Sequence, residues 1–141
     1  MVTYLDSSFL VSLYRPDIHT PAAVEEMGKL GESLTITSLQ VHEVRNAIRL
    51  GVFQQMISQR ECREALQLLD QDIQNGILRP LSVQWNLAFR EAERIGNQFT
   101  ESFGIRAADL LHLAIATVLG ASRFRTFDQR QSRLAKRMGF D

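Results

Sequence analysis

Residues 106–128 read RAADLLHLAIATVLGASRFRTFD. The part from Arg106 to Leu119 is predicted to form a helix that is markedly apolar from Leu110 onward. Phe124 to Phe127 reads as a strand, and Asp128 follows it directly. The longest nearly apolar run, Leu110 to Ala121, spans 12 residues and is too short to cross a bilayer. This stretch predicts a helix and a strand that pack together in an α/β fold.

The rest of the chain repeats this alternation of strands and helices. Capping-box patterns at Thr37/Gln40 and at Ser58/Glu61 open two of the helices. Strands are predicted at residues 2–5, 34–36 and 77–81, and helices at 6–14, 20–31, 37–49, 58–76, 85–102 and 129–138. The order predicts an α/β sandwich with a mainly parallel sheet. No repeat or linker interrupts it, so we expect a single domain over residues 1–141.

Composition narrows the class of protein. The chain has 141 residues, of which 45% are hydrophobic and 23% charged, as in an ordinary globular domain. The single cysteine, Cys62, excludes a disulfide framework and a multi-cysteine zinc site. We expect a cytoplasmic protein with no membrane segment.

The charge is balanced overall but unevenly distributed. The 16 basic and 16 acidic residues cancel, which argues against a general nucleic-acid coat. Residues 121–141 nevertheless carry a local excess of basic side chains. Four arginines there are candidate RNA contacts: Arg123, Arg125, Arg130 and Arg133. Arginine suits bidentate phosphate pairing, although a GC-rich genome would explain its abundance equally well.

Two acids follow predicted strands, and each has a structural explanation. Asp6 comes after Leu5, and Asp128 comes after Phe127. An aspartate at a strand-to-helix turn is a favoured helix N-cap, which is the more common role for either one taken alone.

Two further acids lie on predicted helices. Glu43 falls on or beside the apolar stripe of its helix, where either a ligand role or an ion pair with Arg45 or Arg49 would explain it. Asp109 lies in the first turn of its helix, where acids are favoured and Arg106 can pair with it. His112, one turn later, is expected to be a packed histidine that bonds to the backbone or to Asp109.

The four acids are more informative together. The ends of parallel strands meet at one edge of a sheet, so Asp6, Glu43, Asp109 and Asp128 can converge there. Four carboxylates would repel one another unless a cation or protons relieved the repulsion. Mg²⁺ or Mn²⁺ prefers such oxygen ligands. The pattern predicts a divalent metal site.

Four segments in this order resemble the PIN domain, most closely the small VapC-type toxin ribonucleases. They are Tyr4-Leu-Asp-Ser-Ser8, Ser38-Leu-Gln-Val-His-Glu43, Arg106-Ala-Ala-Asp-Leu-Leu-His-Leu-Ala114 and Thr126-Phe-Asp128. The resemblance implies a three-layer α/β/α sandwich with about five mainly parallel strands. It also implies that the four acids bind Mg²⁺ or Mn²⁺, with Ser8 and Thr126 as polar neighbours.

The same resemblance implies a function and partners. It indicates a metal-dependent endoribonuclease that acts on RNA, a VapB-type antitoxin partner and a homodimer. One alternative is a non-catalytic, toxin-like subunit of an antitoxin and repressor complex. Another is a haloacid-dehalogenase-like phosphatase with Asp6 as nucleophile, although Ser8 stands where that family carries a second Asp. Neither Lys29 nor Lys136 has that family's surrounding motif.

Overall fold

The computed structural model describes residues 2–31 and 34–141. Its backbone forms two compact units. The terminal unit consists of the residues up to Asp6 together with Ser82–Asp141, and the central unit is Ser7–Leu81.

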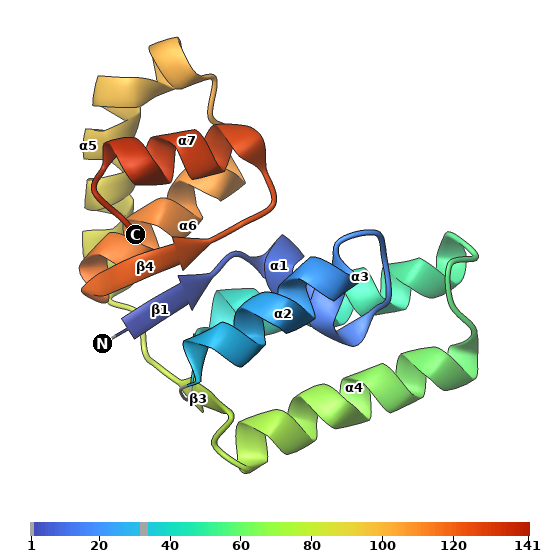
Figure 1. The fold of residues 1–141 in the computed structure, drawn as a ribbon. Helices are drawn as coiled ribbons and strands as arrows, with labels where there is room; N and C mark the ends of the chain where they lie inside the picture. Colours follow the sequence, from blue (N-terminus) through green and yellow to red (C-terminus); the bar gives the residue numbers. More distant parts are fainter. Residues whose placement is uncertain (1, 32–33) are drawn as a thin grey trace. The chain divides into compact units, whose positions relative to one another are not determined.

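The terminal unit pairs the two ends of the chain in a parallel sheet. Strand β1 (Val2–Leu5) lies beside β4 (Ala121–Arg125), with Tyr4 opposite Phe124 in the register (Figure 1). Its helices are α5 (Trp85–Phe103), α6 (Ala107–Val118) and α7 (Gln129–Arg137). Because β1 and β4 are parallel, both strands end at the same edge of this sheet.

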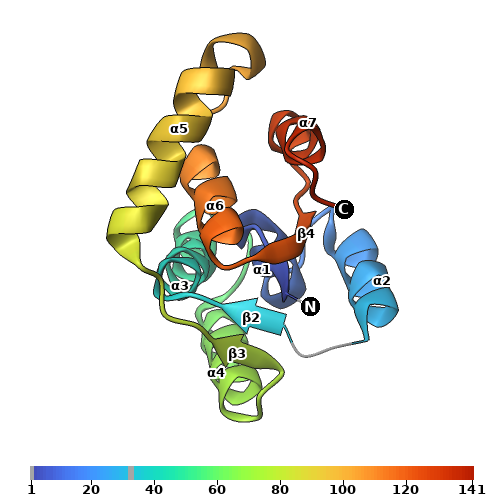
Figure 2. The same cartoon turned by 90° about the vertical axis from the view of Figure 1, so that its left-hand side faces the viewer.

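The core of the terminal unit forms around α6. Five consecutive residues of this helix, from His112 to Ala116, are buried. Tyr4 stacks on Phe124 with 5.5 Å between ring centroids, and its hydroxyl lies 2.7 Å from Nδ1 of His112. Helices α5 and α6 lie side by side (Figure 2), and a Cβ at Gly96 would come within 3.1 Å of a methyl group of Leu110. The lack of a side chain at Gly96 therefore permits this close approach.

The central unit combines four helices with a second parallel pair of strands in the described part of the chain. Its elements are α1 (Ser7–Tyr14), α2 (Thr20–Leu30), β2 (Leu34–Ile36), α3 (Ser38–Phe53), α4 (Gln59–Gln74) and β3 (Leu78–Pro80). Strand β2 pairs with β3, and Pro80 lies opposite Ile36 at the end of the ladder. The core includes fully buried Leu10, Ile48 and Leu69.

Both predicted capping boxes are confirmed. At the start of α3, the N–H of Thr37 donates to Oε1 of Gln40 at 2.7 Å, and the N–H of Gln40 donates back to the Thr37 hydroxyl at 3.4 Å. At the start of α4, Ser58 and Glu61 make the same reciprocal pair, both at 3.0 Å. These local patterns place the helix starts correctly because both partners lie within four residues of sequence.

The last strand differs from the prediction. The sequence indicated a strand at Phe124–Phe127, whereas β4 covers Ala121–Arg125. The hydroxyl of Thr126 donates to Gln131 and accepts from the N–H of Asp128, so the chain turns away from the ladder after Arg125. Asp128 therefore follows a short turn and does not follow the strand directly.

The α/β class and the parallel pairing are confirmed. The strands of the described residues form two sheets of two strands each. A three-layer sandwich with about five strands stays a prediction. The single domain over residues 1–141 also stays a prediction. None of the helices in residues 2–31 and 34–141 is long and apolar enough to span a membrane.

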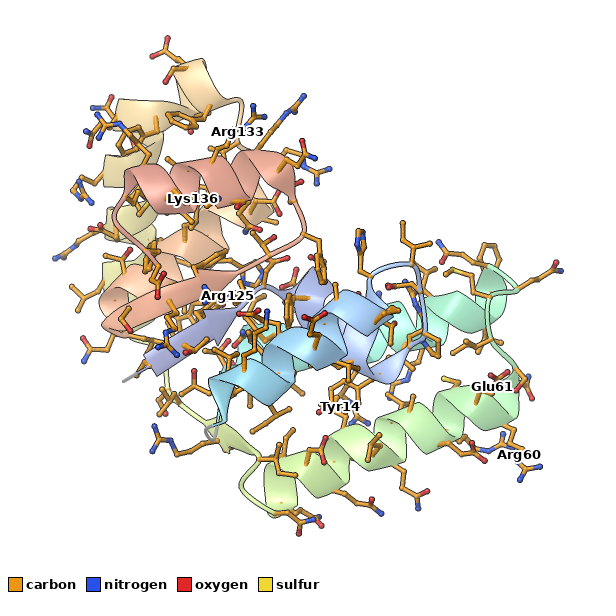
Figure 3. All side chains as sticks on the ribbon, in the orientation of Figure 1. Tyr14, Arg60, Glu61, Arg125, Arg133 and Lys136 are labelled. Carbon is orange, nitrogen blue, oxygen red and sulfur yellow. The ribbon has the colours of Figure 1, made fainter. Side chains whose placement is uncertain are left out.

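Tyr14 offers a test of packing within the central unit. Its hydroxyl (labelled in Figure 3) donates to Oδ2 of Asp72 at 2.6 Å and joins α1 to α4. Burial, reinforced by this bond and by the charge of Asp72, raises the pKa of Tyr14 far above its ordinary value. In the unfolded chain the phenol ionises near about pH 10, so the stability that a neutral Tyr14 contributes falls as pH rises above that value.

We therefore expect Tyr14→Phe to lower the free energy of unfolding by about 1–3 kcal/mol near neutral pH. The variant should lose less additional stability than wild type above about pH 10. Urea unfolding at both pH values measures this, with Arg60→Ala on the exposed face of α4 as the control. Parallel losses in wild type and Tyr14→Phe above pH 10 would contradict the role assigned to the phenol.

Candidate functional site

Asp6 is placed by an extension of the parallel ladder. Its N–H donates to the carbonyl of Arg125 at 2.9 Å, one residue beyond the end of β1. The side chain is 4% exposed. Asp6 is therefore held at the sheet edge where β4 also ends.

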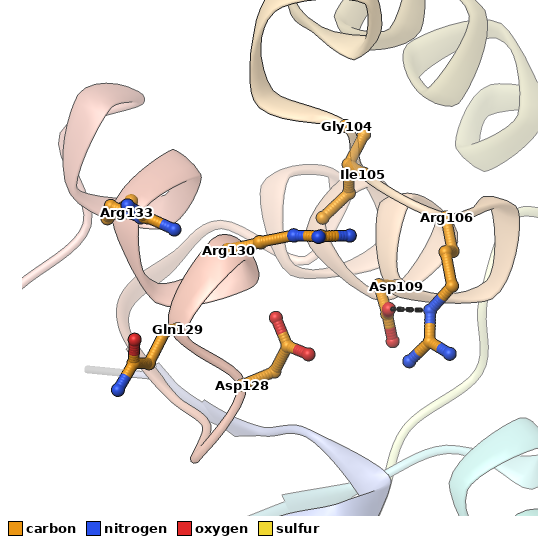
Figure 4. A pocket seen from close by; sticks show the side chains of 8 residues that line it. All are labelled: Gly104, Ile105, Arg106, Asp109, Asp128, Gln129, Arg130 and Arg133. Atoms are coloured by element: carbon orange, nitrogen blue, oxygen red, sulfur yellow. Dashed lines mark hydrogen bonds and ion pairs between the residues drawn. The ribbon is translucent and has the colours of Figure 1, made fainter.

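Asp128 is the N-cap of α7. Its Oδ1 accepts from the N–H of Gln131 at 2.8 Å, and its own N–H donates to the hydroxyl of Thr126 at 3.1 Å. The structural explanation considered for this acid is thus confirmed. Capping holds the carboxylate at the start of α7, facing the same pocket as Asp109 (Figure 4).

Asp109 lies in the first turn of α6 and interacts with the other two acids. Its Oδ2 is 3.2 Å from Nε of Arg106, the ion pair that the sequence indicated. Burial raises the pKa of Asp109, and the negative charges of Asp6 and Asp128 raise it further, while Arg106 lowers it. Three of the four predicted acids therefore repel one another within the terminal unit.

The pocket beside these acids is lined by both acidic and basic side chains. It encloses about 390 Å³ between the start of α6 and the start of α7. Asp109 and Asp128 point into it, and Arg130 reaches across it from α7 toward α6 (Figure 4). Its lining residues are Gly104, Ile105, Arg106, Asp109, Asp128, Gln129, Arg130 and Arg133.

The arginines at the C-terminal end fall into two groups. Arg130 and Arg133 line the pocket, and within the part of the chain that the structure describes neither has an acidic partner within ion-pair distance. Arg123 lies 3.6 Å from the carboxylate of Asp141, and Arg125 donates to the Asp141 carbonyl at 2.6 Å. The second group is therefore already engaged by the end of the chain.

Glu43 and Ser8 belong to the central unit. Oε1 of Glu43 accepts from the hydroxyl of Ser7 at 2.9 Å. Arg45, one of the arginines expected to pair with Glu43, pairs instead with Asp70 at 2.7 Å. Ser8 is exposed, and its carbonyl accepts from the hydroxyl of Ser12 at 3.2 Å.

Two polar residues of the terminal unit, His112 and Gln131, are buried. His112 is 2% exposed and pairs with the hydroxyl of Tyr4, so its role is packing within the core. Gln131 is fully buried, and its side-chain amide contacts both Asp6 and Asp109. Sequence reasoning missed Gln131. Its spacing could have indicated it. Gln131 lies three residues before Leu134 and four before Ala135, so its amide falls on the apolar face of α7.

The donor chemistry of the site suits a hard divalent cation. Carboxylate oxygens that repel one another are the ligands that Mg²⁺ and Mn²⁺ prefer. No three His, Cys, Asp or Glu residues among 2–31 and 34–141 are grouped closely enough to hold an ion. Arg106 occupies Oδ2 of Asp109, and the start of α7 occupies Oδ1 of Asp128. Ion binding would therefore compete with these contacts.

We expect Asp109→Asn to leave the free energy of unfolding unchanged or to raise it. The substitution removes a charge that burial and the neighbouring acids disfavour, while the amide keeps nearly the same shape. Thermal and urea unfolding near neutral pH, without added metal, would measure the effect. A clear loss of stability would mean that the ion pair with Arg106 outweighs the repulsion.

Comparison with known protein families matches residues 3–137 to the family described as the PIN domain. This match covers both units and all four predicted acids. No curated protein matches the chain.

Proposed function

Because the chain belongs to the PIN domain family, whose members are generally Mg²⁺-dependent nucleases, we propose that it is a metal-dependent endoribonuclease. The observation that carries the proposal is the pocket in which Asp109 and Asp128 face Arg130 and Arg133. The acids of this pocket suit a divalent cation, and its arginines suit the phosphates of RNA.

The acids have separate parts in this proposal. Asp6, Asp109 and Asp128 would hold a Mg²⁺ or Mn²⁺ ion. Glu43 is proposed as a fourth carboxylate on the resemblance of its segment, and Ser8 and Thr126 as supporting polar residues. When bound, a divalent cation compensates the charge of the acids and stabilises negative charge that develops on the phosphodiester.

The chain's own residues bind and orient the substrate. Arg130 and Arg133 would hold phosphates on either side of the scissile bond by charge-assisted hydrogen bonds. Attack on phosphorus by water, with departure of the ribose 3′ oxygen, leaves a 5′-phosphate and a 3′-hydroxyl. Product ends of this kind would distinguish hydrolysis from attack by the ribose 2′-hydroxyl.

A toxin role is part of the proposal and rests on the sequence motifs. The segments around Asp6 and Asp109 resemble the VapC type, which implies a VapB-type antitoxin and a homodimer. The alternative, a non-catalytic subunit of an antitoxin complex, uses the same surface without cleaving RNA. Measured cleavage by the purified chain separates the two.

Purified protein should cleave single-stranded RNA in Mn²⁺ or Mg²⁺ and lose this activity in EDTA. Asp109→Asn should lower the rate by roughly two to three orders of magnitude, as expected when one preorganised electrostatic contact is removed. Asp70→Asn is the matched control, because Asp70 lies on the exposed side of α4 and pairs with Arg45. Cleavage that persists in EDTA or in Asp109→Asn would overturn the proposed function.

The two groups of arginines predict different salt dependence of RNA binding. Each phosphate contact releases counterions, so RNA affinity falls as salt rises. The variant Arg130→Ala/Arg133→Ala removes two contacts and should make the plot of log affinity against log salt less steep by about 1.4 for single-stranded RNA. The variant Arg123→Ala/Arg125→Ala should change it less, because Asp141 already engages both side chains. Salt titrations in Ca²⁺, which is expected to slow cleavage, measure both slopes. Equal slopes for wild type and the first variant would place the RNA elsewhere.

A further inference from the structure

Gln131 joins three parts of the candidate site through one buried side chain. Its Nε2 donates to Oδ1 of Asp6 at 3.2 Å and to the backbone carbonyl of Asp109 at 3.1 Å. Its Oε1 accepts from the hydroxyl of Thr126 at 2.6 Å. The residue is fully buried, and both ends of the amide have partners.

The network determines which way the amide points. Asp6 offers a carboxylate oxygen and Asp109 a carbonyl, and both can only accept, so the NH₂ group must face them. The oxygen then faces Thr126, whose hydroxyl can donate. An amide turned the other way would place its oxygen against two acceptors in a buried site. The hydrogen bonds would then not form, which would destabilise the folded protein.

The neutrality of the amide distinguishes it from Arg106. A guanidinium that pairs with a carboxylate places a positive charge there, which would repel a cation, as Arg106 would at Asp109. The NH₂ group of Gln131 holds an oxygen of Asp6 in direction without placing a positive charge beside it. A neutral donor is therefore suited to orient an acid that must remain available to a cation.

We infer that Gln131 is a positioning residue that sets Asp6 and the first turn of α6 in the orientation needed for divalent-metal binding. This inference rests on the proposed function. Thr126 acts on the acids through Gln131, because its hydroxyl donates to the amide oxygen of that residue. The backbone N–H of Gln131 also bonds to Asp128, so one residue relates the three acids of the terminal unit.

A purely structural role makes a different prediction. A buried glutamine that only stabilises the core would, when replaced, lower the free energy of unfolding without changing the metal affinity of the folded protein. Metal affinity is therefore the deciding measurement. The removal of a hydrogen-bond partner of a metal ligand commonly costs about 10–100-fold in affinity.

The test compares Mn²⁺ binding by wild type, Gln131→Met, Asp109→Asn and Ser58→Ala, with free Mn²⁺ followed by electron paramagnetic resonance. Gln131→Met keeps the length of the side chain and removes all its polar atoms. We expect it to bind Mn²⁺ about 10–100-fold more weakly than wild type. Ser58→Ala, which removes the cap of α4, should unfold at a lower temperature than wild type and bind Mn²⁺ like wild type.

A second pair of variants keeps the inference testable if Gln131→Met does not fold. Thr126→Val removes the hydroxyl that holds the amide oxygen, and Thr126→Ser restores it with little change in shape. We expect weaker Mn²⁺ binding in Thr126→Val and near wild-type binding in Thr126→Ser. Circular dichroism and thermal unfolding establish that each variant is folded at the temperature of the measurement.

The outcomes separate this inference from the function on which it rests. If Asp109→Asn weakens Mn²⁺ binding while Gln131→Met, or Thr126→Val in its place, binds like wild type, the positioning role is overturned and the metal site stands. If wild type does not bind Mn²⁺, or if Asp109→Asn binds it equally well, the proposed metal site fails and the positioning role fails with it. Weaker binding in Gln131→Met alongside unchanged Ser58→Ala supports the inference.

Discussion

The parallel pairing of β1 with β4 is the constraint on which the terminal unit depends. It joins residues more than a hundred positions apart and is continued by the bond from the N–H of Asp6 to the carbonyl of Arg125. Two parallel strands end at the same edge, so the acids that follow them arrive on the same side. An antiparallel pair would have placed Asp6 and Asp128 at opposite ends of the sheet.

Charge repulsion is the cost of this arrangement. The pKa of Asp109 is raised by burial and by the charges of Asp6 and Asp128, and the guanidinium of Arg106 offsets only part of that effect. Such a cluster is poorly suited to stabilising a fold and well suited to holding a hard cation. Perturbed pKa values of this kind gather at functional sites in proteins, which favours the metal-binding role proposed for these acids.

The same short segment controls both the geometry and the charge of the pocket. Thr126 ends β4, Asp128 caps α7, and Gln131 turns its amide back toward Asp6 and the start of α6. Arg130, which lies between the cap and the amide, points into the pocket. The start of α7 thus serves the pocket through Asp128 and Arg130 and the buried network through Gln131.

The sequence by itself determined the local structure. The capping boxes at Thr37 and Ser58 and the apolar run of α6 were readable because they depend on neighbours within a few residues. The α/β class followed from the alternation of strands and helices, and the resemblance to the PIN domain followed from the order of four motifs, which the family match confirms. The early end of β4 was not readable, because Thr126 bonds to the side chain of Gln131, and contacts with Asp6 and Asp109, which are distant in sequence, hold that side chain in place.

Only the tertiary structure decided which side chains meet. A sequence cannot tell that Arg123 and Arg125 engage Asp141 while Arg130 and Arg133 face the acids, since all four have the same chemistry and lie within a few residues of one another. Nor can it tell that Gln131 contacts Asp6, a residue at the other end of the chain. Local hydrogen bonds and hydrophobic periodicity are encoded in short segments, whereas the partner of a buried amide depends on the packing of strands and helices distant in sequence.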